Sequence, residues 1–339
     1  MAFNTQLSKT QNYVFGRGVA YFAPFDASGN PMGERDLGNV PGINLQVTSE
    51  QAEHFSSRSG IAKKDLTAVI SVAFNSQIQI EDFSAENLAL FLGGTAGDLA
   101  QTAGSVADEN IVNLESGREY QLGTTSINPT GVRGVTSVAV RVKDFEDASA
   151  RVNTTAYALG DLYTSGGNAY VVSAAGTAAG SAPTFNTVAI GDATTDGGAT
   201  VKWLGATGAK SASTDYALSA ESARFGVLVA GNLGLACALY YSVTGDYLTA
   251  EVDYTKDANT RGQVTSTASG SVSGQFRFIA DNAKGENRDL FISSVSLAPS
   301  GDLPFITSGG DVAQATFDLG VNERDTSTPL VIVDGRPAA

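Results

Sequence analysis

The stretch ISVAFNSQIQIE, residues 70–81, alternates apolar with polar side chains and decides the fold class. Its large apolar residues share one parity: Ile70, Val72, Phe74, Ile78 and Ile80. Successive side chains of a β-strand point to opposite faces, so the run predicts a strand with one buried and one solvated face. Half-polar strands of this kind are typical of antiparallel sheets that pack one face on a core.

The same alternation recurs in residues 138–143, 248–254 and 275–278. In the first of these runs it places Val140 inward and Arg141 in solvent. Val140→Asp is then expected to destabilise the fold, and Arg141→Asp to be nearly neutral. One helix is expected in DFSAENLALFLGG, residues 82–94, with Ser84 as its N-cap and a terminating Gly-Gly pair. We therefore predict a mainly β protein, an antiparallel β-sandwich or open barrel with one short flanking helix.

Two segments lack a clear alternation. Residues 94–129 are polar and weakly patterned, which predicts a long loop or a hairpin that orders only against a partner chain. The apolar run 226–243 is interrupted by Gly231, Asn232 and Gly234, so we interpret it as two strands and not as a membrane-spanning helix. Cys237 is then a buried, inert thiol in a strand.

Composition limits the function classes. The formal net charge of -14 argues against a protein that grips nucleic acid, because affinity for phosphate comes from clustered Lys and Arg. The same charge resists adhesion to anionic membranes. The first residues lack the basic start and apolar run of a signal peptide, and one cysteine excludes an internal disulfide framework. These features predict a protein folded in a cytoplasm.

The sequence contains few of the residues and motifs that build catalytic sites. His54 is the only histidine, and the chain contains neither a G-x-S-x-G motif nor a P-loop. One His and one Cys cannot build a zinc site. The segment holding Asp192 and Asp196 misses the calcium-loop pattern and predicts turns instead. The sequence cannot select a glycosidase pair among 35 acidic residues. We therefore predict no enzyme, and no catalytic, cofactor or metal site.

Residues 152–209 form a nearly uncharged island, with four charged residues where the average of 17% gives about ten. We predict an inserted small all-β domain here, between the two parts (1–151 and 210–339) of a discontinuous main domain. A domain this small needs large apolar residues for a core, which favours burying Trp203 with Tyr170 and Pro183. The alternative is that Tyr170 and Trp203 are exposed and contact a glycan.

Several segments, taken in chain order, resemble the major tail tube proteins of long, non-contractile bacteriophage tails. The opening segment is RGVAYFAPFDASGNPMGERDLGNVPGINLQV, residues 17–47. Later segments are EHFSSRSGIAKKD, SAENLALFLGG, NPTGVRGVTSV, RFIADNAKGENRDLFISSVSLAPSGDL and PLVIVDGRP. Pieces of the island, among them LGDL, DGG and VKW, are similar to a small β-module of phage tail and fibre proteins. The order of these segments, more than any one of them, carries the resemblance.

The resemblance implies a structural virion protein that forms homohexameric rings, and these rings stack into the hollow tail tube. The implied partners are a tape measure protein in the lumen, and tail terminator and baseplate or distal tail proteins at the tube ends. During infection the genome passes through without specific binding, which agrees with the acidic composition. The expected location is the virion, after synthesis in the bacterial host cytoplasm, without any membrane partner. The island would decorate the tube exterior.

Three alternatives stay open: a carbohydrate-binding virion decoration or adhesin, a depolymerase that uses paired carboxylates, and a ring-forming secretion-system tube subunit. The chain ends give two further expectations. The apolar run Leu330, Val331, Ile332 and Val333 is predicted to add as a strand to a sheet or to an adjoining subunit. The N-terminal residues 2–12 are predicted to order when rings stack.

Overall fold

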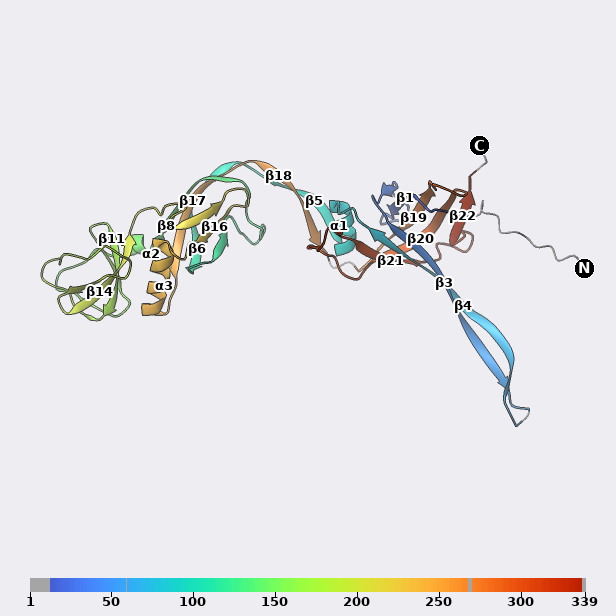
Figure 1. The fold of residues 1–339 in the computed structure, drawn as a ribbon, viewed down its shortest axis with the longest axis horizontal. Coiled ribbons are helices and arrows are strands. Elements are labelled where there is room, and N and C mark those ends of the chain that lie inside the picture. The colour runs from blue at the N-terminus through green and yellow to red at the C-terminus, as the bar shows by residue number, and fades with distance from the viewer. Residues whose placement is uncertain (1–12, 59, 268–269, 337–339) are drawn as a thin grey trace, which may run out of the picture. The chain divides into compact units, whose positions relative to one another are not determined.

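The computed structural model describes residues 13–58, 60–267 and 270–336. It is 51% strand and 8% helix, with antiparallel sheets, so the predicted mainly β fold is confirmed. The chain divides into two compact units. Unit 1 consists of Met1–Asp98 and Gly262–Ala339, and unit 2 is Leu99–Arg261 (Figure 1). The predicted role of residues 2–12 lies outside the described residues.

Unit 1 is built on one eight-stranded sheet. Its strand order is β2-β1-β19-β20-β21-β4-β3, and β22 also pairs with β20. The elements are β1 (Gly18–Pro24), β2 (Arg35–Asp36), β3 (Gly42–Ser56), β4 (Lys63–Ile80), α1 (Ala85–Leu92), β19 (Val272–Ala280), β20 (Arg288–Ser300), β21 (Ala315–Val321) and β22 (Val331–Gly335).

The predicted helix is α1, and it covers the core of unit 1. The Ser84 hydroxyl accepts a hydrogen bond from the Asn87 amide, and the helix ends where Gly93 adopts a left-handed conformation, φ 56°. Phe91 packs edge-on against Phe317 of β21, with ring centroids 5.6 Å apart. The core beneath consists of alternate residues from neighbouring strands, among them Phe22, Ile78, Phe276, Ile292 and Phe317.

The chain passes between the units through β5 (Gly94–Gln101) and β18 (Asn259–Ser266), which pair with each other. Unit 2 then holds three-stranded sheets β6-β17-β8 and β15-β16-β7, and a four-stranded sheet β10-β11-β14-β13. The elements are β6 (Gly104–Leu114), β7 (Glu119–Gln121), β8 (Val135–Val142), α2 (Lys143–Asp147), β9 (Ala156–Tyr157), β10 (Leu162–Ser165), β11 (Asn168–Ala174), β12 (Gly176–Thr177), β13 (Ala193–Asp196), β14 (Ala199–Ala206), β15 (Tyr216–Ser219), β16 (Arg224–Val227), α3 (Asn232–Thr244) and β17 (Leu248–Lys256).

The prediction of two strands in 226–243 is wrong. Only the first residues belong to strand β16, and the remainder forms helix α3. Gly231 is the N-cap, so the glycine interpreted as a strand turn begins the helix instead. Leu233, Gly234, Ala236 and Cys237 are buried, because α3 packs into the core of unit 2. Cys237 is buried as expected, but in a helix.

The prediction for residues 94–129 is also wrong. This segment forms β5, β6 and β7, which pair with β18, β17 and β16 of the same chain. These strands alternate only weakly, because each leaves much of its surface exposed. Their partner strands lie more than 100 residues away in the chain, so the segment by itself does not reveal the pairing. The expectation of a single helix is corrected as well, since α2 and α3 join α1.

The unit boundaries differ from the predicted domain boundaries. Compact units meet at residues 98/99 and 261/262, whereas composition suggested 151/152 and 209/210. The island 152–209 has a sheet and a small aromatic core of its own, yet it lies inside unit 2. Its Ala169, Val171 and Leu204 share one core cluster with Leu233 and Ala236 of α3. Composition marked a change of surface character, but the core continues across it.

Candidate assembly surface

Strands β3 and β4 form a hairpin that runs past the other strands of unit 1 (Figure 1). They pair with each other from Gly42 opposite Gln79 to Ser56 opposite Lys63. The next strand of the sheet, β21, pairs only with residues 75–80 of β4. We call residues 47–74, which lie beyond this pairing, the arm.

The arm continues the apolar row of the core face. Residues directly opposite in an antiparallel pair lie on the same face. At the base of the hairpin Ile43 pairs with Ile78, which is buried in the core. Two residues further along each strand the pair is Leu45 and Ser76, and then Val47 and Phe74. The core-side pattern therefore extends beyond the residues of β4 that β21 covers, to where the described residues place no further strand beside it.

The opposite face of the arm is mostly polar. Its cross-strand pairs are Gln46 with Asn75, Thr48 with Ala73, and Glu50 with Ser71. The next pair joins Gln51 to Val69, so the register skips Ile70 and forms a bulge there. Up to this bulge the arm is an amphipathic ribbon, whereas in its outer half Leu66 pairs with His54 on the polar face.

The apolar side chains of the arm are exposed. Seven large ones have exposed fractions between 53% and 76%: Val47, Phe55, Ile61, Leu66, Val69, Ile70 and Val72. Full burial of one such side chain stabilises a protein by about 1.5–3 kcal/mol. Contiguous exposed apolar surface marks interaction sites, and a strand edge adds unpaired backbone groups that another chain can use. The arm therefore has the physical properties of an assembly surface.

Two cross-strand polar contacts lie in the outer half of the arm, an ion pair and a hydrogen bond. Lys64 Nζ lies 2.5 Å from Glu53 Oε1, and His54 Nδ1 lies 2.6 Å from Asp65 Oδ1. All four side chains are well exposed, so each pair contributes little to stability. The only histidine of the chain thus pairs across the arm.

The C-terminal run forms a strand, as predicted. Val331 pairs with Ile292 and Val333 with Leu290 of β20, so the sheet to which it adds is that of its own chain. Leu330 precedes this strand, and Ile332 and Val333 keep exposed side chains. A hydrogen-bonded ion pair follows, in which Arg336 lowers the pKa of Asp289. A role of these residues in contacts between subunits stays a prediction.

The suggested glycan contact of Tyr170 is wrong, because its side chain is only 1% exposed. It packs against Phe185, with ring centroids 4.4 Å apart, and against Tyr163. Trp203 is half-buried beside this cluster, and its Nε1 donates a hydrogen bond to Asn168 Oδ1 at 3.0 Å. The core interpretation is thus confirmed for Tyr170, whereas Trp203 is only partly buried, and Phe185 stands in the cluster where Pro183 was expected.

Sequence reasoning missed a buried ion pair in the same region. Arg151 Nε lies 2.6 Å from Asp196 Oδ2, and the two side chains are 3% and 0% exposed. The Tyr163 hydroxyl and the Ala179 amide also donate to Asp196. Hydrogen bonding to Arg151 is the main cause that lowers the pKa of Asp196. The turn pattern around Asp196 carried no signal of burial.

The described ranges contain no group of three or more His, Cys, Asp or Glu side chains placed to hold a metal ion. None of the helices found in those ranges has the length and apolar character needed to cross a membrane.

Comparison with known families finds a match to a family of unknown function over part of the chain. Residues 13–159 match the family described as Protein of unknown function UCP028589. This range begins just before β1 and extends into the island, and it includes the whole arm. It covers less than half of the chain, so the finding is a similarity over that range. A search of curated proteins finds no match.

Proposed function

We propose that the protein is a structural virion subunit that self-assembles into stacked six-fold rings, which form the hollow tail tube of a non-contractile bacteriophage. The observation that carries the self-assembly is the arm, whose core-side apolar row continues into solvent. A second copy of the chain is the partner that supplies a matching sheet in fixed stoichiometry. The ordered sequence segments favour the phage tube over a secretion-system tube.

Two further features support the proposal. First, the outer edge of β3 ends the sheet of unit 1, so strand pairing between copies would satisfy backbone groups that one copy leaves to water. Second, a net charge of -14 suits a wall past which DNA must slide, since like charge denies the phosphates a binding site. The partners at the lumen and tube ends belong to the same proposal.

Paired substitutions on the two faces of the arm test the proposal. Val47→Glu with Val72→Glu places two carboxylates on the apolar face at diagonal positions. Gln46→Glu with Ala73→Glu adds the same charge, in the same diagonal geometry, to the opposite face. Analytical ultracentrifugation and negative-stain microscopy are applied to both variants and to the original chain.

We expect hollow rings or tubes from the original chain and from the opposite-face variant, and monomers from the apolar-face variant. Circular dichroism should show the same folded content in all three, because the substituted residues are exposed. A strictly monomeric original chain would contradict the assembly function. Tubes formed equally well by both variants would remove the arm from the interface.

A further inference from the structure

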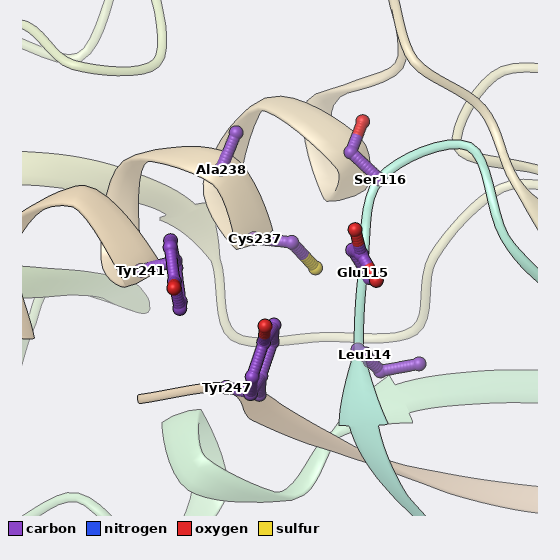
Figure 2. Close-up of a pocket in the computed structure, with 7 residues that line it drawn as sticks. All are labelled: Leu114, Glu115, Ser116, Cys237, Ala238, Tyr241 and Tyr247. Carbon is purple, nitrogen blue, oxygen red and sulfur yellow. The ribbon is translucent and has the colours of Figure 1, made fainter. Parts of the chain in front are cut away.

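Unit 2 contains a hollow of about 340 Å³ between α3 and the end of β6 (Figure 2). Leu114–Ser116 line one side, and Cys237 and Tyr241 of α3 line another. Tyr247, directly before β17, completes the wall. The volume is at the small end of the range found for ligand pockets.

Two tyrosines form an aromatic wall of this hollow. The rings of Tyr241 and Tyr247 stack with centroids 4.8 Å apart and planes 28° from parallel. They are 48% and 41% exposed, whereas Tyr163, Tyr170 and Tyr216 of the same unit are buried. The two rings already stack on each other in the folded chain, so binding would order few side chains.

Of the remaining lining residues, Leu114, Cys237 and Ala238 are apolar, and Glu115 and Ser116 are polar. Cys237 is 3% exposed, and burial raises the pKa of its thiol to about 12, so it is neutral. Glu115 is the only charged side chain of the lining, and Arg118 Nε lies 3.2 Å from its carboxylate. The Ser116 hydroxyl adds a donor and an acceptor beside it.

These groups select a ligand class. An anion would meet Glu115 without a lining cation to oppose it. A cation would have to compete with Arg118, which lies outside the lining, for the Glu115 carboxylate, so it gains little. An apolar molecule would desolvate Glu115 and Ser116 without replacing their hydrogen bonds. A sugar ring offers an apolar C–H face to the tyrosines and hydroxyl donors to the carboxylate. We propose that this hollow binds one ring of an uncharged carbohydrate.

Ligand-observed saturation-transfer NMR on the full-length chain tests this site. The probes are the methyl glycosides of glucose, galactose and N-acetylglucosamine, with glucuronate as anionic control and tetramethylammonium as cationic control. We expect transfer to the ring protons of at least one neutral glycoside. Tyr247→Ala and Glu115→Gln should each lower it several-fold, and Phe305→Ala, which removes an exposed aromatic ring from unit 1, should not.

Ser116→Ala provides a milder variant if Tyr247→Ala proves unfolded by circular dichroism, and it should also weaken the signal. Absence of transfer to all three neutral glycosides would overturn the proposal. So would an undiminished signal in the folded pocket variants, or preferential binding of either charged control. The measurement works on monomers, so its result is independent of the assembly proposed above.

Discussion

Two arginines of unit 2, Arg151 and Arg141, carry the same charge in different environments. Arg151 and Asp196 form a pair from which water is excluded, and hydrogen bonds satisfy the carboxylate from several sides. Arg141 faces four carboxylates at the surface: Asp253 at 2.6 Å, Glu251 at 2.9 Å, Asp108 at 3.2 Å and Glu146 at 3.3 Å. The residues around Arg151 and Arg141 in the sequence do not show which of the two arginines is buried.

Asp196→Asn is expected to destabilise unit 2 by about 3–5 kcal/mol, because it leaves the Arg151 charge buried without a counter-charge. The folded-state pKa of Asp196 lies below the ordinary value of 3.8. The carboxylate therefore stabilises the fold above that value, and the contribution is lost as pH falls through the folded-state pKa. Urea unfolding from neutral to acidic pH should show a flatter acid dependence for Asp196→Asn than for the original chain. Asp161→Asn, in the same island but exposed, is the control and should match the original.

Arg141→Asp is expected to lower the melting temperature, contrary to the near-neutral effect that alternation suggested. The substitution removes the guanidinium that binds four carboxylates and adds a fifth carboxylate among them. Val140→Asp should also be destabilising, since Val140 is fully buried. Added salt distinguishes charge repulsion from the burial of a carboxylate. It should partly restore the melting temperature of Arg141→Asp by screening the repulsion, and leave that of Val140→Asp unchanged. Equal salt responses would show that repulsion is not the origin.

At the scale of elements, the β3–β4 hairpin and β22 of unit 1 both have outer surfaces that the described part of the chain leaves uncovered. The β3–β4 hairpin leaves its arm exposed, and β22 leaves Ile332 and Val333 exposed although it is paired with β20. The difference lies in anchoring. β22 is held through five residue pairs and by Arg336 to Asp289, whereas the arm pairs only with itself.

Truncation before Thr328 is expected to remove β22 and lower the melting temperature of unit 1 by several degrees, because the apolar partners Leu290 and Ile292 lose their cover. Replacing Ile332 and Val333 by Thr keeps the strand and removes only exposed apolar surface, so its melting temperature should stay close to the original. Calorimetry measures stability and electron microscopy measures tubes. Tubes of normal length from the truncated chain would exclude β22 from assembly.

At the scale of the whole molecule, the division into two units makes a specific excision possible. Asp98 and Gly262 lie at the boundary, in strands β5 and β18 that pair with each other. A short turn can therefore join the two strands with little loop-closure cost. Removing residues 152–209 alone is different, because Ala169, Val171 and Leu204 belong to the core of unit 2.

Excision of 99–261 with a Gly/Ser turn in its place should yield a folded unit 1 that still assembles through the arm. Excision of 152–209 should instead leave a chain whose unit 2 melts at lower temperature or aggregates, since it opens the shared core. Calorimetry and microscopy of both variants decide between the two divisions of the chain. A stable, cooperative unit 2 after removal of 152–209 would restore the island as an independent domain.

The sequence by itself determined the local features of this protein. Period-two alternation predicted β4, β8, β17 and β19, and the Ser84 cap with the Gly-Gly stop predicted α1, because these signals act between residues close in the chain. Tertiary structure decided which part of an alternating strand is covered: Ile78 and Ile80 are buried, while Ile70 and Val72 of the same parity are exposed. It also decided that Asp196 is buried and that β6 pairs with β17. Burial depends on partners that meet only when distant segments fold together, and no spacing within one segment encodes them.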